Sequence, residues 1–225
     1  MKVTIVGAHG KVARQLVPLL VAGGHEAVGV VRNPDHTADV AADGATPVVL
    51  DIESATSAEL AEHVRGSDAV VFSAGAGGKG APERKQHVDR DGAVKLAEAA
   101  EVSGVRRYLL VSSIGLQSVV DGATPDGVEE GFVAYLRAKL EAEDALRSRP
   151  SLDLTSLRPG HLLDEPATGR VALTRSTTDA VDGGVPRADV AAVLLALLEA
   201  PGTAGQTLEL VSGDVPVEEA VAALA

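Results

Sequence analysis

A tyrosine and a lysine in this sequence are spaced for proton-transfer chemistry. Tyr135 and Lys139 are four residues apart, which on a helix places their Cβ atoms on one face, about 5–6 Å from each other. A lysine ammonium beside a phenol favours the phenolate, as a group that exchanges protons near neutral pH requires. The same spacing also arises by chance in surface packing. Because the chain has only two tyrosines and the pair follows a predicted strand, we interpret it as catalytic.

Two serines end that strand, which is predicted over residues 107–112. Ser113 is expected to orient a substrate carbonyl opposite Tyr135, and Ser112 to contact a bound cofactor. Lys139 is given two roles, because its ammonium can also bond the hydroxyls of a ribose. The predicted catalytic set is therefore Ser113, Tyr135 and Lys139.

The N-terminus has the residues of a phosphate-binding turn. A β-branched run at residues 2–6 predicts a buried strand, and it is followed by Gly7, Gly10 and apolar residues at helical spacing. Gly7 permits a tight turn, Gly10 lets a pyrophosphate approach the backbone, and the helix that begins near residue 11 points its N–H groups at that anion. A dinucleotide is thus expected to contact Gly7, His9, Gly10, Lys11 and Val12.

Three further strand ends carry candidate dinucleotide contacts. Arg32 ends the second predicted strand, where arginine pairs with a 2′-phosphate and favours NADP, whereas an acid would favour NAD. NAD stays possible, since Arg32 could be a solvated charge and Asp35 lies nearby. Asp51 and Ile52 are placed to meet the adenine, although a turn aspartate is an equally good interpretation. The fourth predicted strand leads into three small residues, Ser73, Ala74 and Gly75. Because their side chains are small, a ribose or nicotinamide can approach the backbone closely there.

The elements that must position these residues alternate between strand and helix. Strands are predicted at residues 2–6, 26–32, 46–50, 69–73, 107–112, 154–157, 170–174 and 207–211. Helices are predicted from near residue 11, at 58–64, 83–103, 128–147, 187–199 and 217–224, with at most a short one at 39–43. Glycine-rich and polar loops are predicted at 74–81 and 115–127. This alternation predicts an α/β fold with a doubly wound parallel sheet. We treat residues 1–225 as a single domain, in which residues from about 159 form a small cap over the substrate.

Composition excludes several function classes. The net charge of −12 disfavours a nucleic-acid partner, because phosphates would be repelled. There is no cysteine, which excludes disulfides and thiolate metal sites, and the six histidines are not spaced as a metal site. No apolar run is long enough to span a bilayer. We expect a cytoplasmic protein with a small-molecule substrate and no membrane partner, as a monomer or homodimer.

Seven motifs occur in the order found in one protein family. They are Gly7-x-x-Gly10-x-x-Ala13, Arg32, Asp51, Val111-Ser112-Ser113, Tyr135-x-x-x-Lys139, Arg158-Pro159-Gly160 and residues 186–190. Together they resemble the atypical short-chain dehydrogenase/reductases of the NAD(P)H-binding, NmrA-like and biliverdin-reductase-B-like group, over nearly the whole chain. The last glycine of the first motif is alanine here. The resemblance implies a Rossmann sheet of order 3-2-1-4-5-6-7 and a bound NADP. It also implies that Pro159 and Gly160 lie by the nicotinamide, and His161 follows them as a further candidate contact.

Three function hypotheses remain open at this point. The first is an NADP-dependent oxidoreductase, or an epimerase with bound NADP, that acts on a small carbonyl or hydroxyl compound. The second is a non-catalytic NADP(H) redox sensor that binds a protein partner. The third is a flavin-type reductase that works without a protein acid. Tyr135 and Lys139 favour the first, and the shortage of aromatic residues favours small aliphatic or polar substrates.

Overall fold

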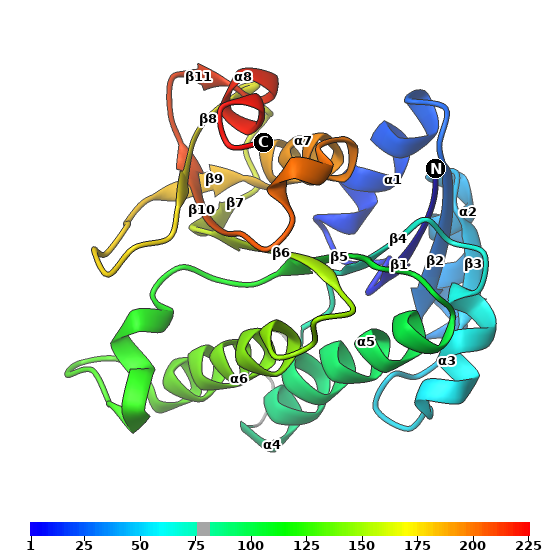
Figure 1. Ribbon diagram of the computed structural model, residues 1–225, viewed down its shortest axis with the longest axis horizontal. Helices are drawn as coiled ribbons and strands as arrows, with labels where there is room; N and C mark the ends of the chain where they lie inside the picture. The colour runs from blue at the N-terminus through cyan, green and yellow to red at the C-terminus, as the bar shows by residue number, and fades with distance from the viewer. Residues whose placement is uncertain (76–81) are drawn as a thin grey trace.

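A computed structural model, which describes residues 1–75 and 82–225, contains one nine-stranded sheet (Figure 1). Its order is β11-β8-β10-β6-β5-β4-β1-β2-β3, and the seven strands from β10 to β3 are parallel. These seven have the predicted order 3-2-1-4-5-6-7, with β10 as the seventh. Their bounds are β1 Lys2–Val6, β2 Glu26–Val31, β3 Thr46–Val49, β4 Ala69–Phe72, β5 Arg107–Val111, β6 Asp153–Pro159 and β10 Thr207–Ser212.

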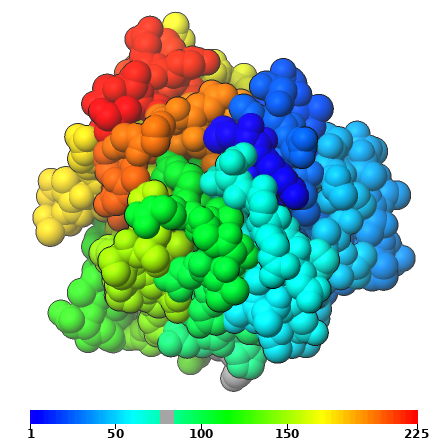
Figure 2. Space-filling view, turned by 45° about the vertical axis from the view of Figure 1, so that its right-hand side comes forward, coloured from blue at the N-terminus to red at the C-terminus, as the bar shows by residue number. Residues whose placement is uncertain are grey.

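Helices cover both faces of the sheet, so the fold is the predicted doubly wound α/β type (Figure 1). One face carries α1 Ala13–Ala22, α7 Arg187–Glu199 and α8 Val217–Ala222. The other carries α3 Ser57–Val64, α5 Gly92–Val102 and α6 Glu130–Arg147. Figure 2 shows α7, in orange, beside the dark-blue N-terminal residues, which are almost two hundred positions away along the chain.

The sheet separates two apolar cores because its central strands are buried on both sides. Along β4, Val71 enters the core under α1 and α7, while Val70 and Phe72 enter the core under α3 and α5. All four residues of β4 are buried. A continuous apolar run, rather than an alternating one, is the sequence pattern that such a strand requires.

The helix predicted over residues 83–103 has an interruption. It begins as α4 Pro82–Lys85, continues through a π-helical turn over Gln86–Asp91, and ends as α5. A π turn inserts an extra residue into the helix and shifts the direction of the side chains on it, and such turns are frequent at functional sites. Here the turn buries the carboxylate of Asp89.

The loop predicted at 115–127 contains more structure than the sequence indicated. Residues Leu116–Gly122 form a 3₁₀ segment, in which Leu116 and Val119 pack on Val133 and Leu136 of α6. The short helix predicted at 39–43 is present as α2 Thr37–Ala42, which follows a 3₁₀ turn at Pro34–His36. The glycine-rich loop predicted at 74–81 lies mostly outside the described residues.

The region predicted as a substrate cap, from about residue 159, contributes strands to the main sheet and also forms a small sheet of its own. Three of its strands extend the main sheet: β10 and the antiparallel strands β8 Arg170–Arg175 and β11 Val215–Pro216. A separate two-stranded sheet, β7 His161–Leu163 with β9 Gly184–Pro186, was not predicted from sequence. No helix among the described residues is long and apolar enough to cross a membrane.

Candidate functional site

The turn between β1 and α1 has the backbone that an anion-binding loop requires. Gly7 adopts a positive φ of +86°, and a Cβ atom there would lie 2.7 Å from the backbone of Ala74. The N-cap residue of α1, Val12, offers no side-chain hydrogen bond to the first turn. The N–H groups of Arg14 and Gln15 donate to the carbonyls of Gly10 and Val12, so the N–H groups that a phosphate group could use are those of Lys11, Val12 and Ala13.

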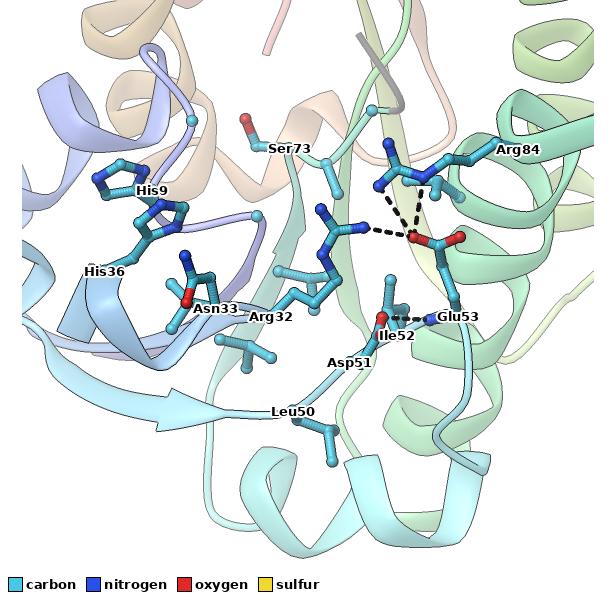
Figure 3. A pocket seen from close by; sticks show the side chains of 18 residues that line it. His9, Arg32, Asn33, His36, Leu50, Asp51, Ile52, Glu53, Ser73 and Arg84 are labelled. Carbon is cyan, nitrogen blue, oxygen red and sulfur yellow. Dashed lines mark hydrogen bonds and ion pairs between the residues drawn. The ribbon is translucent and has the colours of Figure 1, made fainter. Parts of the chain in front are cut away.

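Two adjacent cavities open at the carboxyl ends of the parallel strands, and four residues line both of them: Gly10, Ser73, Ala74 and Gly75. The first, about 310 Å³, lies over β1, β2 and β3 (Figure 3). We call it the first cavity, and its wall includes the predicted residues Gly7, His9, Gly10, Arg32, Asp51, Ile52, Ser73, Ala74 and Gly75.

Two arginines in the first cavity share one carboxylate. Oε1 of Glu53 accepts hydrogen bonds from Nη1 of Arg32 at 2.8 Å and from Nη2 and Nε of Arg84 at 3.0 and 3.1 Å. The hydrogen bond from Arg84, with the added bond and charge of Arg32, holds the pKa of Glu53 below its usual range. Arg84 and Glu53 were not predicted as site residues. Arg84 comes from α4, so nothing local in the sequence connects it with the end of β2.

His9 turns away from the phosphate-binding turn. Its ring stacks on that of His36 with centroids 3.6 Å apart, and its Nε2 lies 2.9 Å from Asp39 Oδ2. Figure 3 shows the two rings side by side at one wall of the first cavity. The predicted contact between His9 and a cofactor stays a prediction, and His36 lines the same wall.

The second cavity, about 530 Å³, lies over β4 and β5 and is bounded by α6. Its lining includes the predicted residues Gly10, Lys11, Val12, Ser73, Ala74, Gly75, Ser112, Tyr135 and Lys139. Tyr135 and Lys139 lie on one face of α6, as their spacing predicts, and Lys139 Nζ is 5.8 Å from the centroid of the Tyr135 ring.

Lys139 is held in a buried ion pair that the sequence did not predict. Its Nζ lies 3.0 Å from Oδ1 of Asp89 and donates to the carbonyl of Val111 at 3.0 Å. Both side chains are almost completely buried. Burial by itself lowers the pKa of Lys139, but the charge and hydrogen bond of Asp89, together with the charges of Tyr135 and Glu143, outweigh burial and the pKa is raised. Lys139 is therefore a fixed cation, and Asp89 offsets part of the charge that it presents to the Tyr135 hydroxyl.

Replacing Asp89 by asparagine should destabilise the fold by an amount that depends on pH above neutrality. In Asp89→Asn, the carboxylate charge no longer offsets the burial of Lys139, so we expect the free energy of unfolding to fall by about 3–5 kcal/mol at pH 7. Because burial then lowers the lysine pKa below its unfolded value of about 10.4, the loss should shrink as pH rises toward that value. Urea unfolding at pH 7 and pH 9.5 measures the loss, with the exposed Asp126→Asn as control. An equal loss at both pH values would contradict the prediction.

The two serines after β5 differ in their surroundings. Oγ of Ser113 donates to the carbonyl of Ile114 at 3.0 Å, and Ser113 is not among the residues that line the second cavity. Ser112 lines it, and its buried Oγ has no hydrogen-bond partner among the described residues. Ser112 is thus the serine that is positioned to meet a ligand, which the adjacent sequence positions alone did not distinguish.

The residues predicted near the nicotinamide from the family resemblance lie on the turn between β6 and β7. Pro159 accepts a hydrogen bond from the N–H of Ile114, and Gly160 packs where a Cβ would lie 2.2 Å from the carbonyl oxygen of Gly183. His161 is exposed. None of the three is among the residues that line either cavity. Their contact with a cofactor stays a prediction.

Other charged residues in the second cavity were missed. Lys85 is buried and donates to the carbonyl of Gly131 at 2.6 Å, and Glu129 lies on the same wall. Arg187 and Lys11 both bind Asp164, at 2.7 and 2.6 Å. The aromatic residue Phe132 also lines this cavity and contacts Tyr135, with ring centroids 5.7 Å apart. Aromatic surface is therefore concentrated here although the chain contains little of it.

Known proteins resemble this chain along its length. The NAD(P)H-binding family model matches residues 7–201. The uncharacterized sugar epimerase YhfK of Bacillus subtilis is 33% identical over 222 residues, which cover 98% of this chain and 99% of YhfK. A structure from Bacillus halodurans, a candidate NAD-dependent epimerase/dehydratase, is 36% identical, covers all of both chains and has a TM-score of 0.88.

A third relative is a reductase. The anaerobillin reductase ChuY of Escherichia coli O157:H7 is 28% identical, with a TM-score of 0.78 over 96% of this chain and 98% of ChuY. The family match covers the glycine turn, both cavities and the helix that bears Tyr135 and Lys139. This chain therefore belongs to the NAD(P)H-binding family, whose ligand is a nicotinamide dinucleotide.

Proposed function

We propose that this protein is an NADP-dependent oxidoreductase, or an epimerase that uses bound NADP, of the short-chain dehydrogenase type. Its substrate is a small carbonyl or hydroxyl compound. The observation that supports this best is the second cavity, in which Tyr135, the Asp89–Lys139 pair and Ser112 meet at the ends of β4 and β5. The match to YhfK, which is described as a sugar epimerase, supports the same class of reaction.

A nicotinamide dinucleotide fits the two cavities and the turn between β1 and α1 in three respects. The uncapped helix α1 and the glycine turn suit the pyrophosphate, the first cavity suits the adenosine, and the small residues Ala74 and Gly75 let the ribose of the nicotinamide approach the backbone. When bound, the cofactor supplies or accepts a hydride. Lys139, paired with Asp89, holds the ribose hydroxyls in this proposal.

The protein's own task is to supply or remove a proton. When a carbonyl is reduced, negative charge grows on its oxygen, and a donor must lie within hydrogen-bond distance of it. Tyr135 provides the hydroxyl and Ser112 the second hydrogen bond to the same oxygen. Lys139 contributes a fixed positive charge beside the phenol. In the reverse direction Tyr135 removes the proton from an alcohol.

Arg32 should set the choice between the two cofactors. A charge-assisted hydrogen bond to the 2′-phosphate, of about 1.5–3 kcal/mol, corresponds to roughly ten- to hundredfold tighter binding of NADPH than NADH. Arg32→Ala should remove most of this difference, which calorimetry at moderate salt measures. Equal affinities in the unmodified protein would refute the choice of NADP.

Reduction of a large conjugated substrate is a second candidate function. Phe132 and Tyr135 form an aromatic pair on the wall of the second cavity, which could hold a flat ring, and the similarity to ChuY points the same way. A screen of small carbonyl compounds, sugars, flavins and linear tetrapyrroles with NADPH separates the two candidates. A marked loss of tetrapyrrole or flavin turnover in Phe132→Ala, with small-substrate turnover unchanged, would favour this second function.

A further inference from the structure

The first cavity contains a carboxylate in a place suited to a phosphate. Glu53, Arg32 and Arg84 come from three different segments: the loop after β3, the end of β2 and α4. The side chains of Arg32 and Arg84 both donate to a single atom, Oε1 of Glu53 (Figure 3). Two guanidinium groups that can donate to one carboxylate oxygen can also donate to a phosphate oxygen of similar size and charge.

The loop that carries Glu53 is held in place from two sides. The N–H of Glu53 donates to Oδ1 of Asp51 at 3.0 Å, which closes a turn. Nζ of Lys95 donates to the carbonyls of Ile52 and Glu53 at 2.9 and 3.0 Å. The backbone of Glu53 is therefore fixed, whereas its side chain, one quarter exposed, reaches the arginines through bonds that can rotate.

The two arginines carry one more charge than Glu53 neutralises. Both are partly exposed, at 52% for Arg32 and 37% for Arg84, so each has N–H groups that can reach a ligand. A dianionic phosphate would attract the guanidinium groups more strongly than a single carboxylate does. A ligand without that phosphate would gain nothing from them.

We propose that Arg84 is the second arginine of a 2′-phosphate site and that Glu53 is an internal counter-ion which the phosphate displaces. Glu53 keeps Arg32 and Arg84 together in the empty site and lowers its affinity for the phosphate. This inference rests on the proposed use of NADP. It adds a residue pair that sets the strength and the specificity of binding.

Calorimetry with adenosine 2′,5′-bisphosphate and with AMP tests the inference without any turnover. The two probes differ only in the 2′-phosphate. Arg84→Ala should weaken the bisphosphate about tenfold or more and leave AMP unchanged, and Arg84→Lys should restore part of the loss. Glu53→Gln should strengthen the bisphosphate several-fold, again without effect on AMP. Arg90→Ala is the matched control, because Arg90 pairs with Asp91 and Glu141 outside the cavity.

The outcomes separate this inference from the proposed cofactor. If the unmodified protein prefers the bisphosphate and Arg32→Ala abolishes that preference, NADP is supported whatever the other variants do. The inference itself is overturned if Arg84→Ala weakens both probes equally, since Arg84 would then serve the adenine or the fold. It is also overturned if Glu53→Gln weakens the bisphosphate, which would make Glu53 a positioning residue. Weaker AMP binding in Glu53→Gln would instead show that Glu53 binds the ribose.

Discussion

Replacing Tyr135 by phenylalanine should reduce turnover by about 10²–10⁴-fold, the typical contribution of a positioned acid or base. The substitution removes the hydroxyl and keeps the ring, so the contact with Phe132 and the packing over Lys139 should persist. The affinity for NADPH should hardly change, because the Asp89–Lys139 pair remains in place. Steady-state kinetics measures the first quantity and calorimetry the second.

The other tyrosine of the chain provides the control. Tyr108 is fully buried in β5, and its hydroxyl donates to the carbonyl of Ala93 at 2.9 Å. Tyr108→Phe should cost about 1 kcal/mol of folding free energy and leave turnover unchanged. If Tyr135→Phe turns over as fast as the unmodified protein, the proton comes from another group, and Tyr135 only packs.

Replacing Arg158 by methionine should lower the free energy of unfolding by about 3–5 kcal/mol. Arg158, in β6, donates to both oxygens of Glu143 at 2.9 and 2.7 Å, and lies 3.6 Å from Glu209 of β10. Burial alone would lower the pKa of Arg158, but its hydrogen bonds to Glu143 and the charge of that residue raise it. Without the arginine, the buried carboxylates of Glu143 and Glu209 would lose the cation that they share.

Chemical denaturation at two pH values tests the prediction for Arg158. The deficit should shrink between pH 7 and pH 5, because buried carboxyls without a cation take up protons more readily in the folded state. The triple variant Glu143→Gln, Arg158→Met, Glu209→Gln should recover much of the loss. Arg65→Met, at an exposed site, is the control and should have little effect. A small loss in Arg158→Met would show that the network contributes little.

The order of elements and the local motifs were accessible from the sequence because both depend on short-range rules. The four-residue spacing of Tyr135 and Lys139 places them on one face of any helix. The turn after β1 requires a positive φ at residue 7, which glycine adopts without strain. The order of the seven parallel strands came instead from the family resemblance, which implies 3-2-1-4-5-6-7, and the structure has that order. A strand was predicted at residues 170–174, but its antiparallel pairing as β8 with β10 and with the two-residue β11 was not, because no crossover helix precedes it to fix its place in the sheet.

The partners of the site residues depend on packing between distant segments. Asp89 lies fifty positions before Lys139, on a π turn that hydrophobic periodicity does not predict. One signal was present in the sequence: Asp89 stands four and seven positions before the buried Ala93 and Leu96, on the apolar face of the predicted helix. The neighbouring serines at the end of β5 look alike in sequence.

What the sequence alone determined was therefore the glycine turn, Arg32 and the Tyr135–Lys139 pair, and the edge of the sheet at which they gather. Only the tertiary structure showed which other residues join them and which side chains touch. Asp89 was paired with Lys139, Arg84 was joined to Arg32 through Glu53, and Ser112 was turned toward the second cavity. The physical reason is that side-chain contacts across a sheet depend on how helices from different parts of the chain pack together, and no local pattern encodes that.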